Sequence, residues 1–203
     1  LLNVIASSVG SLSNPTRLSN TFKSVKGLNV KNETISTYLD CFIDAYILCK
    51  SYRYDIKGRS YIDTPLKYYF TDIGLRNARL NFRQQEENHI MENIIYNELI
   101  ARGFNVDVGV VEYNHIDENG KKVRSQLEVD FVVNQTEKRY YIQSALTVAD
   151  EDKRKQEVNS LNRIDDSYTK IVVVRDNVLP WTDDKGVQYI NIEDFLLDKI
   201  NEL

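Results

Sequence analysis

Cysteine, histidine and long apolar runs are scarce in this sequence of 203 residues, which has two Cys, two His and three Pro. Cys41 and Cys49 are too few for a disulfide framework, and no further Cys or His accompanies them at the spacing of a zinc site. We therefore expect buried thiols in a cytoplasmic protein. The sequence contains no run of about 18 apolar residues and no secretory signal pattern, so a membrane protein is not expected.

Common nucleotide and hydrolase motifs are also missing. The sequence contains neither a Gly-rich phosphate loop with Lys and Ser/Thr nor a Gly-rich dinucleotide fingerprint, so ATP or NAD binding by a known motif is not expected in this chain. A Ser or Cys hydrolase would depend on His89 or His115 as its base. His89 precedes a predicted helix and is typical of a surface or capping residue, and His115 is expected in a solvated loop.

Charge is distributed unevenly along the chain. Residues 1–80 carry 11 basic and 6 acidic side chains, whereas residues 81–203 carry 15 and 24. A basic first half is attracted to phosphate, and an acidic second half resists phosphate unless a bound cation neutralises part of its charge. The asymmetry predicts two domains, 1–80 and 81–203. The first residues, Leu1 to Ala6, are typical of a helix interior without a cap, and we expect the chain to begin inside a longer protein.

The first domain is predicted to contain short helices followed by a β-hairpin. Asn14-Pro15 is typical of a helix start, and Asn32 is expected to cap a second helix that carries an apolar stripe. Tyr46 to Tyr54 and Lys67 to Phe70 predict the two strands of the hairpin. Helix, helix and hairpin is the order of a winged helix.

The second domain is predicted to have the order αβββαβ followed by a last strand and helix. Period-3.6 apolar spacing and surface charge predict helices at His89 to Ala101, Asp150 to Leu161 and Glu193 to Ile200. Alternating or continuous apolar runs predict strands at Val106 to Tyr113, Val123 to Val133, Arg139 to Leu146, Lys170 to Arg175 and Val187 to Ile190. The fold class is therefore α/β (α+β).

Three polar residues of the second domain form the best candidate site. Glu128 and Asp130 lie two apart on one predicted strand and share a face, and Gln143 lies on the next strand. The order αβββαβ brings the helix that carries Glu92 against the same sheet. Glu92, Asp130 and Gln143 would offer oxygen ligands to Mg²⁺. The alternative is a structural role, in which the acids accept backbone N–H groups or pair with Arg124 or Arg139.

The sequence resembles a known family at this point. The stretches that carry the resemblance are Lys67 to Leu75, Met91-Glu92-Asn93 with Glu98-Leu99, Leu127 to Val132 and Tyr141 to Ala145. They resemble the C-terminal region of uncharacterised bacterial AAA-type ATPases, where a winged helix and a PD-(D/E)XK nuclease-like domain follow the ATPase. The resemblance implies an N-terminal ATPase domain that binds ATP outside this chain, and assembly of the full-length protein into an oligomer.

The resemblance assigns Glu92 and Asp130 to the helix acid and strand acid of the nuclease pattern. The D/E-x-K tripeptide reads Gln143-Ser144-Ala145, so the second acid is an amide and the lysine is a methyl group. Loss of one electrostatic partner of a transition state commonly lowers the rate by about 10²–10³, so a degenerate site is expected. A weak Mg²⁺-dependent nuclease is the alternative, with a displaced lysine from Lys153 or Lys155.

The basic residues of the first domain are the candidates for nucleic-acid binding. The helix after Asn32 carries Glu33, Asp40 and Asp44 and no Lys or Arg, so base readout by this helix is not expected. Contact with backbone phosphate is expected instead. The candidates are Arg17, Lys23, Lys26, Lys31, Arg53, Lys57 and Arg59. The sequence thus predicts an accessory interaction region with nucleic acid as its partner, and a purely protein-binding module is a further alternative.

Overall fold

The computed structural model is a mixed α/β structure and describes residues 1–83, 86–118, 120–136 and 138–197. The chain forms two compact units. The first comprises Leu1–Tyr52 with Asp63–Asn97, and the second comprises Arg53–Ile62 with Glu98–Leu203. The tip of the first hairpin therefore groups with the later part of the chain. The limits predicted from charge, 1–80 and 81–203, stay a prediction.

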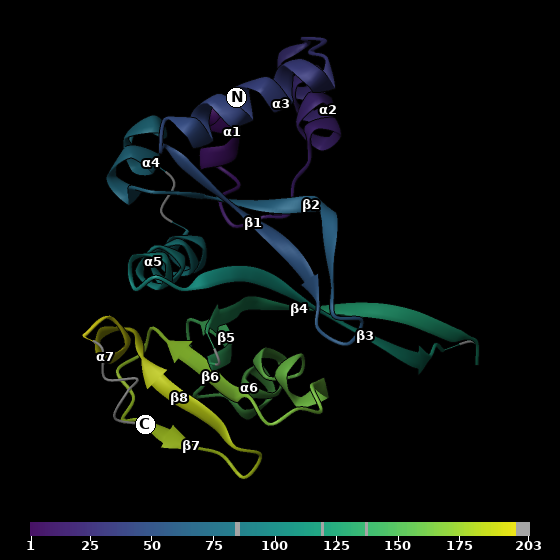
Figure 1. Cartoon of the computed structure of the whole chain (residues 1–203), viewed down its shortest axis with the longest axis vertical. Helices are drawn as coiled ribbons and strands as arrows, with labels where there is room; N and C mark the ends of the chain where they lie inside the picture. The colour runs from purple at the N-terminus through teal and green to yellow at the C-terminus, as the bar shows by residue number, and fades with distance from the viewer. Residues whose placement is uncertain (84–85, 119, 137, 198–203) are drawn as a thin grey trace. The chain divides into compact units, whose positions relative to one another are not determined.

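The first unit begins with three helices, α1 (Leu2–Ala6), α2 (Pro15–Lys26) and α3 (Asn32–Asp44), labelled in Figure 1. The predicted start of α2 is confirmed, because the side chain of Asn14 accepts a hydrogen bond from the Arg17 N–H at 2.7 Å. The predicted cap of α3 is wrong. Lys31 occupies the cap position, and Asn32 instead donates to the Thr16 hydroxyl at 3.0 Å.

Apolar residues on these helices contribute to the core of the first unit. Leu18 of α2 is buried, and so are Ile35 and Leu39 of α3, in agreement with the apolar stripe predicted for this second helix. Strand β1 (Leu48–Asp55) begins after Tyr46, whose φ of 54° lies outside the extended region. Strand β2 (Ser60–Phe70) is longer than predicted and is followed by helix α4 (Ile73–Arg79).

Helix α5 (Glu87–Ala101) starts two residues before its predicted first residue. Asn93 joins it to the end of β2 within the first unit. The Asn93 amide accepts from the Phe70 N–H at 2.9 Å and donates to the Phe70 carbonyl at 2.8 Å. This paired contact satisfies both backbone groups of Phe70, the last residue of β2. It therefore fixes the position of α5 along the strand.

The second unit contains most of a mixed eight-stranded sheet with the order β2-β1-β3-β4-β5-β6-β8-β7. Strands β3 (Asn105–Ile116), β4 (Lys122–Gln135) and β5 (Lys138–Ala145) are antiparallel neighbours. Strand β6 (Thr169–Val174) is parallel to β5, and β8 (Val187–Asn191) is parallel to β6. The predicted order αβββαβ and the last strand are confirmed. The short strand β7 (Trp181–Thr182) was not predicted.

The helices of the second unit are shorter than the charge pattern predicts. Helix α6 (Glu151–Glu157) has no buried residue and ends four residues before the predicted limit, where the 3-10 turn η1 (Leu161–Arg163) follows. Helix α7 (Ile192–Leu196) is capped by Asn191, and the predicted end at Ile200 lies outside the described residues. The buried Val and Ile residues of β6 and β8, and not α6, supply apolar core in this part of the second unit.

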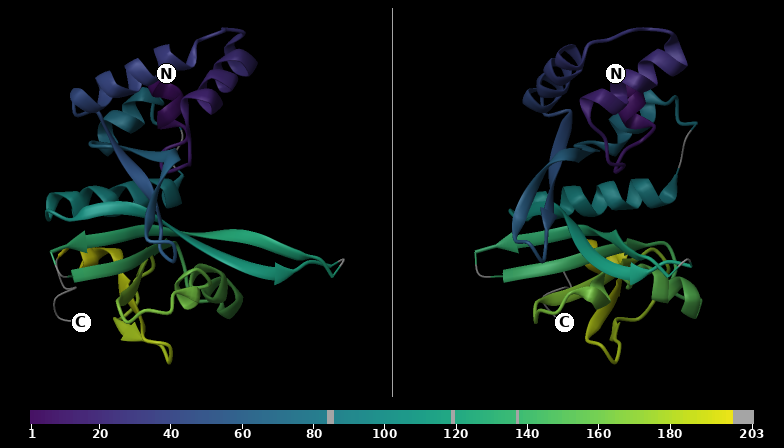
Figure 2. Two further views of the ribbon diagram at one scale, coloured as in Figure 1. Left: turned by 45° about the vertical axis from the view of Figure 1, so that its right-hand side comes forward. Right: turned by 90° about the vertical axis from the view of Figure 1, so that its right-hand side faces the viewer.

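Strands β3 and β4 continue past their neighbours as a two-stranded arm, which Figure 2 shows extending beyond the other strands of the second unit. The register shifts between Asp107 and Gly109, at the point where Asp55 and its neighbours pair with β3. A β-bulge of this kind bends a strand and increases its twist. The arm carries His115, which lies in β3 and not in the predicted loop, although it is exposed as expected.

None of the described helices is long and apolar enough to cross a membrane.

We predict that Gly109→Ala lowers the free energy of unfolding by about 1–3 kcal/mol, the usual cost of overpacking a well-packed core. A Cβ at this position would lie 2.8 Å from Val129 and Val132 side-chain atoms and 3.0 Å from Ile56. Urea denaturation measures the change. Ser125→Ala on the arm is the matched control and should change stability by less than about 0.5 kcal/mol. Equal stability of Gly109→Ala and the parent protein would contradict the tight packing at the bulge.

Candidate functional site

Glu92, the predicted helix acid, lies in the first unit on α5 and is buried with 9% of its surface exposed. Its Oε1 accepts from the Lys67 ammonium at 2.8 Å and from the Tyr69 hydroxyl at 2.7 Å. Lys67 is 3% exposed. A buried carboxylate needs such partners because transfer of an unpaired ion from water costs several kcal/mol. Glu92 therefore has a protein ammonium as its counter-ion.

The backbone of Gly10 lies directly beside the carboxylate of this buried ion pair. An ideal Cβ at Gly10 would lie 3.1 Å from both oxygens of the Glu92 carboxylate, and the residue has a φ of +73°. Both facts favour glycine, since a side chain would meet the carboxylate and strain the backbone. The Gly10 N–H also donates to the Tyr68 carbonyl at 3.2 Å. This contact holds the segment after α1 beside β2.

The partners of Glu92 were not predicted from the sequence, although a signal was present. Lys67 and Tyr69 are two apart on β2 and so share one face of the strand. A lysine between aromatic and aliphatic residues in a strand is seldom buried unless it is paired. The buried acid on α5 was predicted, but its link to this lysine depends on how the helix packs on the strand.

Asp130 and Gln143, the other two candidates, lie in the second unit on the neighbouring strands β4 and β5. The Oδ2 atom of Asp130 accepts from the Ser144 N–H at 2.9 Å, and Oε1 of Gln143 accepts from the Asp130 N–H at 3.3 Å. The structure therefore brings Asp130 and Gln143 together and gives both of them backbone partners. Ala145, at the lysine position of the tripeptide, is 3% exposed and packs in the apolar core.

Glu92 belongs to one compact unit and the Asp130–Gln143 pair to the other. Across residues 1–83, 86–118, 120–136 and 138–197, no group of three or more His, Cys, Asp or Glu side chains is placed to hold a metal ion. The metal ligands Glu92 and Asp130 and the catalytic set Glu92, Asp130 and Gln143 stay predictions. The structural alternative is confirmed for Asp130, whose carboxylate accepts a backbone N–H, whereas Arg124 pairs with Glu112 and Arg139 donates to Asn134 at 2.8 Å.

A further buried carboxylate, Asp107, lies in the second unit near the bulge. It accepts a hydrogen bond from the Tyr61 hydroxyl at 3.0 Å. Burial raises the pKa of Asp107, and the hydrogen bond from Tyr61 partly opposes that increase. The contact ties β2 to β3 and gives this acid a structural role.

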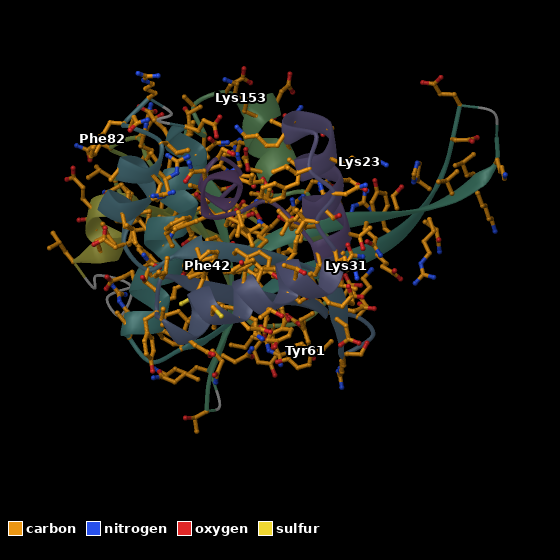
Figure 3. The ribbon with its side chains drawn as sticks, turned by 90° about the horizontal axis from the view of Figure 1, so that it is seen from above. Lys23, Lys31, Phe42, Tyr61, Phe82 and Lys153 are labelled. Atoms are coloured by element: carbon orange, nitrogen blue, oxygen red, sulfur yellow. The ribbon has the colours of Figure 1, made fainter. Side chains whose placement is uncertain are left out.

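The predicted phosphate-contacting residues are mostly exposed. Figure 3 shows Lys23 and Lys31 on the same side of the first unit. Arg17 also donates to the Leu12 carbonyl at 2.9 Å. In the second unit Lys57 and Arg59 are exposed at the hairpin tip. Arg53 is half-buried and donates to Gln126 at 3.1 Å, so it is the least accessible of the seven candidates.

The remaining candidates have ordinary surroundings. Cys41 is exposed and Cys49 is half-buried, so the prediction of buried thiols is wrong for Cys41. His89 lies on the first turn of α5, and its Nε2 atom lies 4.0 Å from the carboxylate of Glu86, the residue before the helix. Lys153 and Lys155 are exposed on α6, and Lys155 pairs with Glu151 at 2.8 Å. These lysines belong to a solvated helix face.

We predict that Lys67→Met lowers the free energy of unfolding by about 3–5 kcal/mol, because it leaves the Glu92 carboxylate buried without its counter-ion. The double variant Lys67→Met with Glu92→Gln should recover much of the loss, since the amide oxygen still accepts from Tyr69. Chemical denaturation of both variants measures this. Lys155→Met, which removes an exposed ion pair, is the control and should cost less than about 1 kcal/mol. A loss no larger for Lys67→Met than for this control would show that the buried pair is dispensable.

Comparison with known proteins gives similarity without an assigned activity. A family described as "Domain of unknown function (DUF8612)" matches residues 1–86. An "Uncharacterized protein" of Haemophilus influenzae is 32% identical over 193 residues, which is 95% of this chain and 44% of that relative. The chain therefore spans less than half the length of this relative. No solved structure matches the chain.

Proposed function

We propose that this chain is an interaction region that binds the phosphate backbone of nucleic acid through the basic residues of α2 and Lys31. The observation that carries the proposal is the charge of this helix. Its twelve residues include Arg17, Lys23 and Lys26 and no acid, and Lys31 follows directly before α3. Within the part of the chain that the structure describes, Lys23, Lys26 and Lys31 are exposed and take part in no ion pair. Exposed lysines on α2 and on the segment that follows it are suited to phosphate contacts.

The adjacent helix α3 supports binding without base readout. It carries Glu33, Asp40 and Asp44 and no Lys or Arg. A helix that reads base edges in the major groove normally presents Arg, Lys, Asn or Gln, and its acids are repelled by phosphate. We therefore propose that α2 contacts the backbone and that α3 keeps the binding independent of sequence.

The second unit supports a role other than hydrolysis. The Asp130 carboxylate and the Gln143 carbonyl accept backbone N–H groups, and the third position of the tripeptide is the buried Ala145. A nuclease of the PD-(D/E)XK type needs two acids for the metal and a lysine for the attacking water or the developing charge. We propose a degenerate PD-(D/E)XK-like domain next to a winged-helix-like domain.

The proposal also covers the longer protein to which this chain would belong, because the chain is similar to only part of its relative. The Haemophilus relative is more than twice as long as the matched segment. This length leaves room for the AAA-type ATP-binding domain that the family resemblance implies. We propose that the chain acts as the accessory region of a cytoplasmic, oligomeric ATPase of this type, with ATP bound outside the chain.

The affinity for double-stranded DNA should fall steeply as salt rises, and the triple variant Lys23→Ala, Lys26→Ala, Lys31→Ala should reduce that dependence. Each lost phosphate contact lowers the slope of log affinity against log salt by about 0.9, so the expected decrease is roughly 2–3. Fluorescence anisotropy at several salt concentrations measures both slopes.

The control for this experiment is Lys121→Ala, Lys122→Ala, Lys185→Ala, which removes the same charge from exposed positions of the second unit. This variant should leave the slope close to that of the parent protein. An equal decrease in both variants would contradict a specific role of α2. A chain that binds no DNA at low salt would favour the protein-binding alternative.

Incubation with DNA and Mg²⁺ should yield no cleavage above background, and Asp130→Asn should leave this result unchanged. The physical reason is the loss of both the second acid and the lysine from the tripeptide. Gel analysis of linear and supercoiled substrates provides the measurement. Mg²⁺-dependent cutting that Asp130→Asn abolishes would establish the nuclease alternative.

A further inference from the structure

A hollow of about 480 Å³ lies within the second unit, apart from every residue assigned to the nuclease pattern. Three segments far apart in the sequence form it. The residues that matter for its chemistry come from the β1–β2 tip, from the start of β5 and from the connection before β6: Tyr54, Lys57, Arg59, Arg139, Asp166 and Tyr168. Its volume falls in the range of small-molecule sites, which is about 300–1,000 Å³.

The hairpin tip presents two cations to this hollow. The Asp55 carboxylate accepts from the backbone N–H groups of Lys57 and Gly58 at 3.1 and 2.9 Å, and it thereby fixes the turn. A Cβ on Gly58 would collide with the same carboxylate. Arg59 follows with a φ of 52°, a conformation that is costly for a residue with a side chain. Lys57 and Arg59 are exposed and form no ion pair among the described residues.

One of the two acids that line the hollow, Asp166, already accepts two hydrogen bonds. The Oδ2 atom of Asp166 accepts from the Tyr141 hydroxyl at 2.6 Å, and Oδ1 accepts from the Tyr168 N–H at 3.2 Å. Burial is the main cause of the raised pKa of Tyr141, and the hydrogen bond to Asp166 is the second cause. The Tyr141 hydroxyl therefore keeps its proton and stays a donor at neutral pH. Asp166 therefore serves to position Tyr168. Three cations, Lys57, Arg59 and Arg139, and two acids, Asp165 and Asp166, line the hollow, which leaves it with one net positive charge.

Aromatic surface adjoins this positive charge. The Arg139 guanidinium lies 5.7 Å from the ring centre of Tyr54 and 5.1 Å from that of Tyr168. Its Nε donates to Asn134, which helps to keep the group in place. The Tyr168 ring also meets Tyr141 edge-on at 6.3 Å and yet remains 43% exposed. A planar ligand such as a base can stack on an exposed aromatic ring, because every base has a π-face.

From these contacts we infer that the hollow binds a nucleotide, with its phosphate near Lys57 and Arg59 and its base against Tyr168. The combination of cations and an exposed aromatic ring is what selects this class of ligand. A ligand with phosphate alone would gain nothing from Tyr168, and an uncharged aromatic ligand would gain nothing from the tip. The site belongs to the second unit and does not depend on α2.

Isothermal titration of the full chain with 5′-AMP tests this inference, with adenosine and inorganic phosphate as the partial ligands. AMP should bind at least about tenfold more tightly than either of them. A 5′-phosphorylated oligonucleotide of four thymidines, titrated in parallel, separates the two sources of the ligand. Tighter binding of AMP identifies a free nucleotide, and tighter binding of the oligonucleotide identifies a strand end.

Two variants assign the binding to this hollow. Tyr168→Ala should weaken AMP binding by roughly tenfold, which is in the range of one lost base stack. Lys57→Ala with Arg59→Ala should weaken it by at least as much and should reduce its salt dependence. The matched controls are Tyr38→Ala, an exposed tyrosine of α3, and Lys121→Ala with Lys185→Ala.

Failure of both AMP and the oligonucleotide to bind overturns the inference. Binding that the hollow variants leave unchanged overturns it as well, and so does inorganic phosphate that binds as tightly as AMP. The triple α2 variant should keep its affinity for AMP. Loss of DNA binding with retained AMP binding, or the reverse, therefore separates the fate of this site from that of the proposed function.

Discussion

A carboxylate that leaves water must be paired with a cation or with hydrogen-bond donors, and this constraint determines what the acids of this protein can do. Glu92 meets it with the Lys67 ammonium and the Tyr69 hydroxyl. Asp130 meets it with the Ser144 N–H. In each case these partners belong to the protein, an ammonium and a hydroxyl for Glu92 and a backbone N–H for Asp130. The contacts of these two acids join α5 to β2 and β4 to β5.

The same constraint leads to different consequences for the cations. Lysines on α2 and at the hairpin tip stay in water, where an unpaired charge costs little. These exposed cations remain available to a polyanion, whereas Lys67 is buried against Glu92 and is not available. The buried pairing of Lys67 with Glu92, set against the exposed lysines on α2 and at the tip that take part in no ion pair among the described residues, is the physical basis for proposing binding in place of hydrolysis. It also explains why the two proposed sites, one on α2 and one beside Tyr168, contain no residue of the buried pairs.

Much of the local structure followed from the sequence. Asn14-Pro15 marked the start of α2, the apolar spacing of Ile35 and Leu39 marked the buried face of α3, and the order αβββαβ was present in the hydrophobic pattern. These features depend on interactions within a few residues or on period alone. The errors occurred where a distant partner intervened. Asn32 left the cap of α3 to contact Thr16, and the charged run after Asp150 formed only two turns because it buries nothing.

The sequence by itself determined most of the helices and strands, the uneven charge and the replacement of the tripeptide by Gln143-Ser144-Ala145, because each is read from neighbouring residues. Only the tertiary structure decided that Lys67 neutralises Glu92, since the two are brought together by the packing of a helix on a strand. It likewise decided that Tyr54, Arg139 and Tyr168 line one hollow. No short motif contains residues from three segments, and their meeting depends on the register of the sheet and on the turn at its tip.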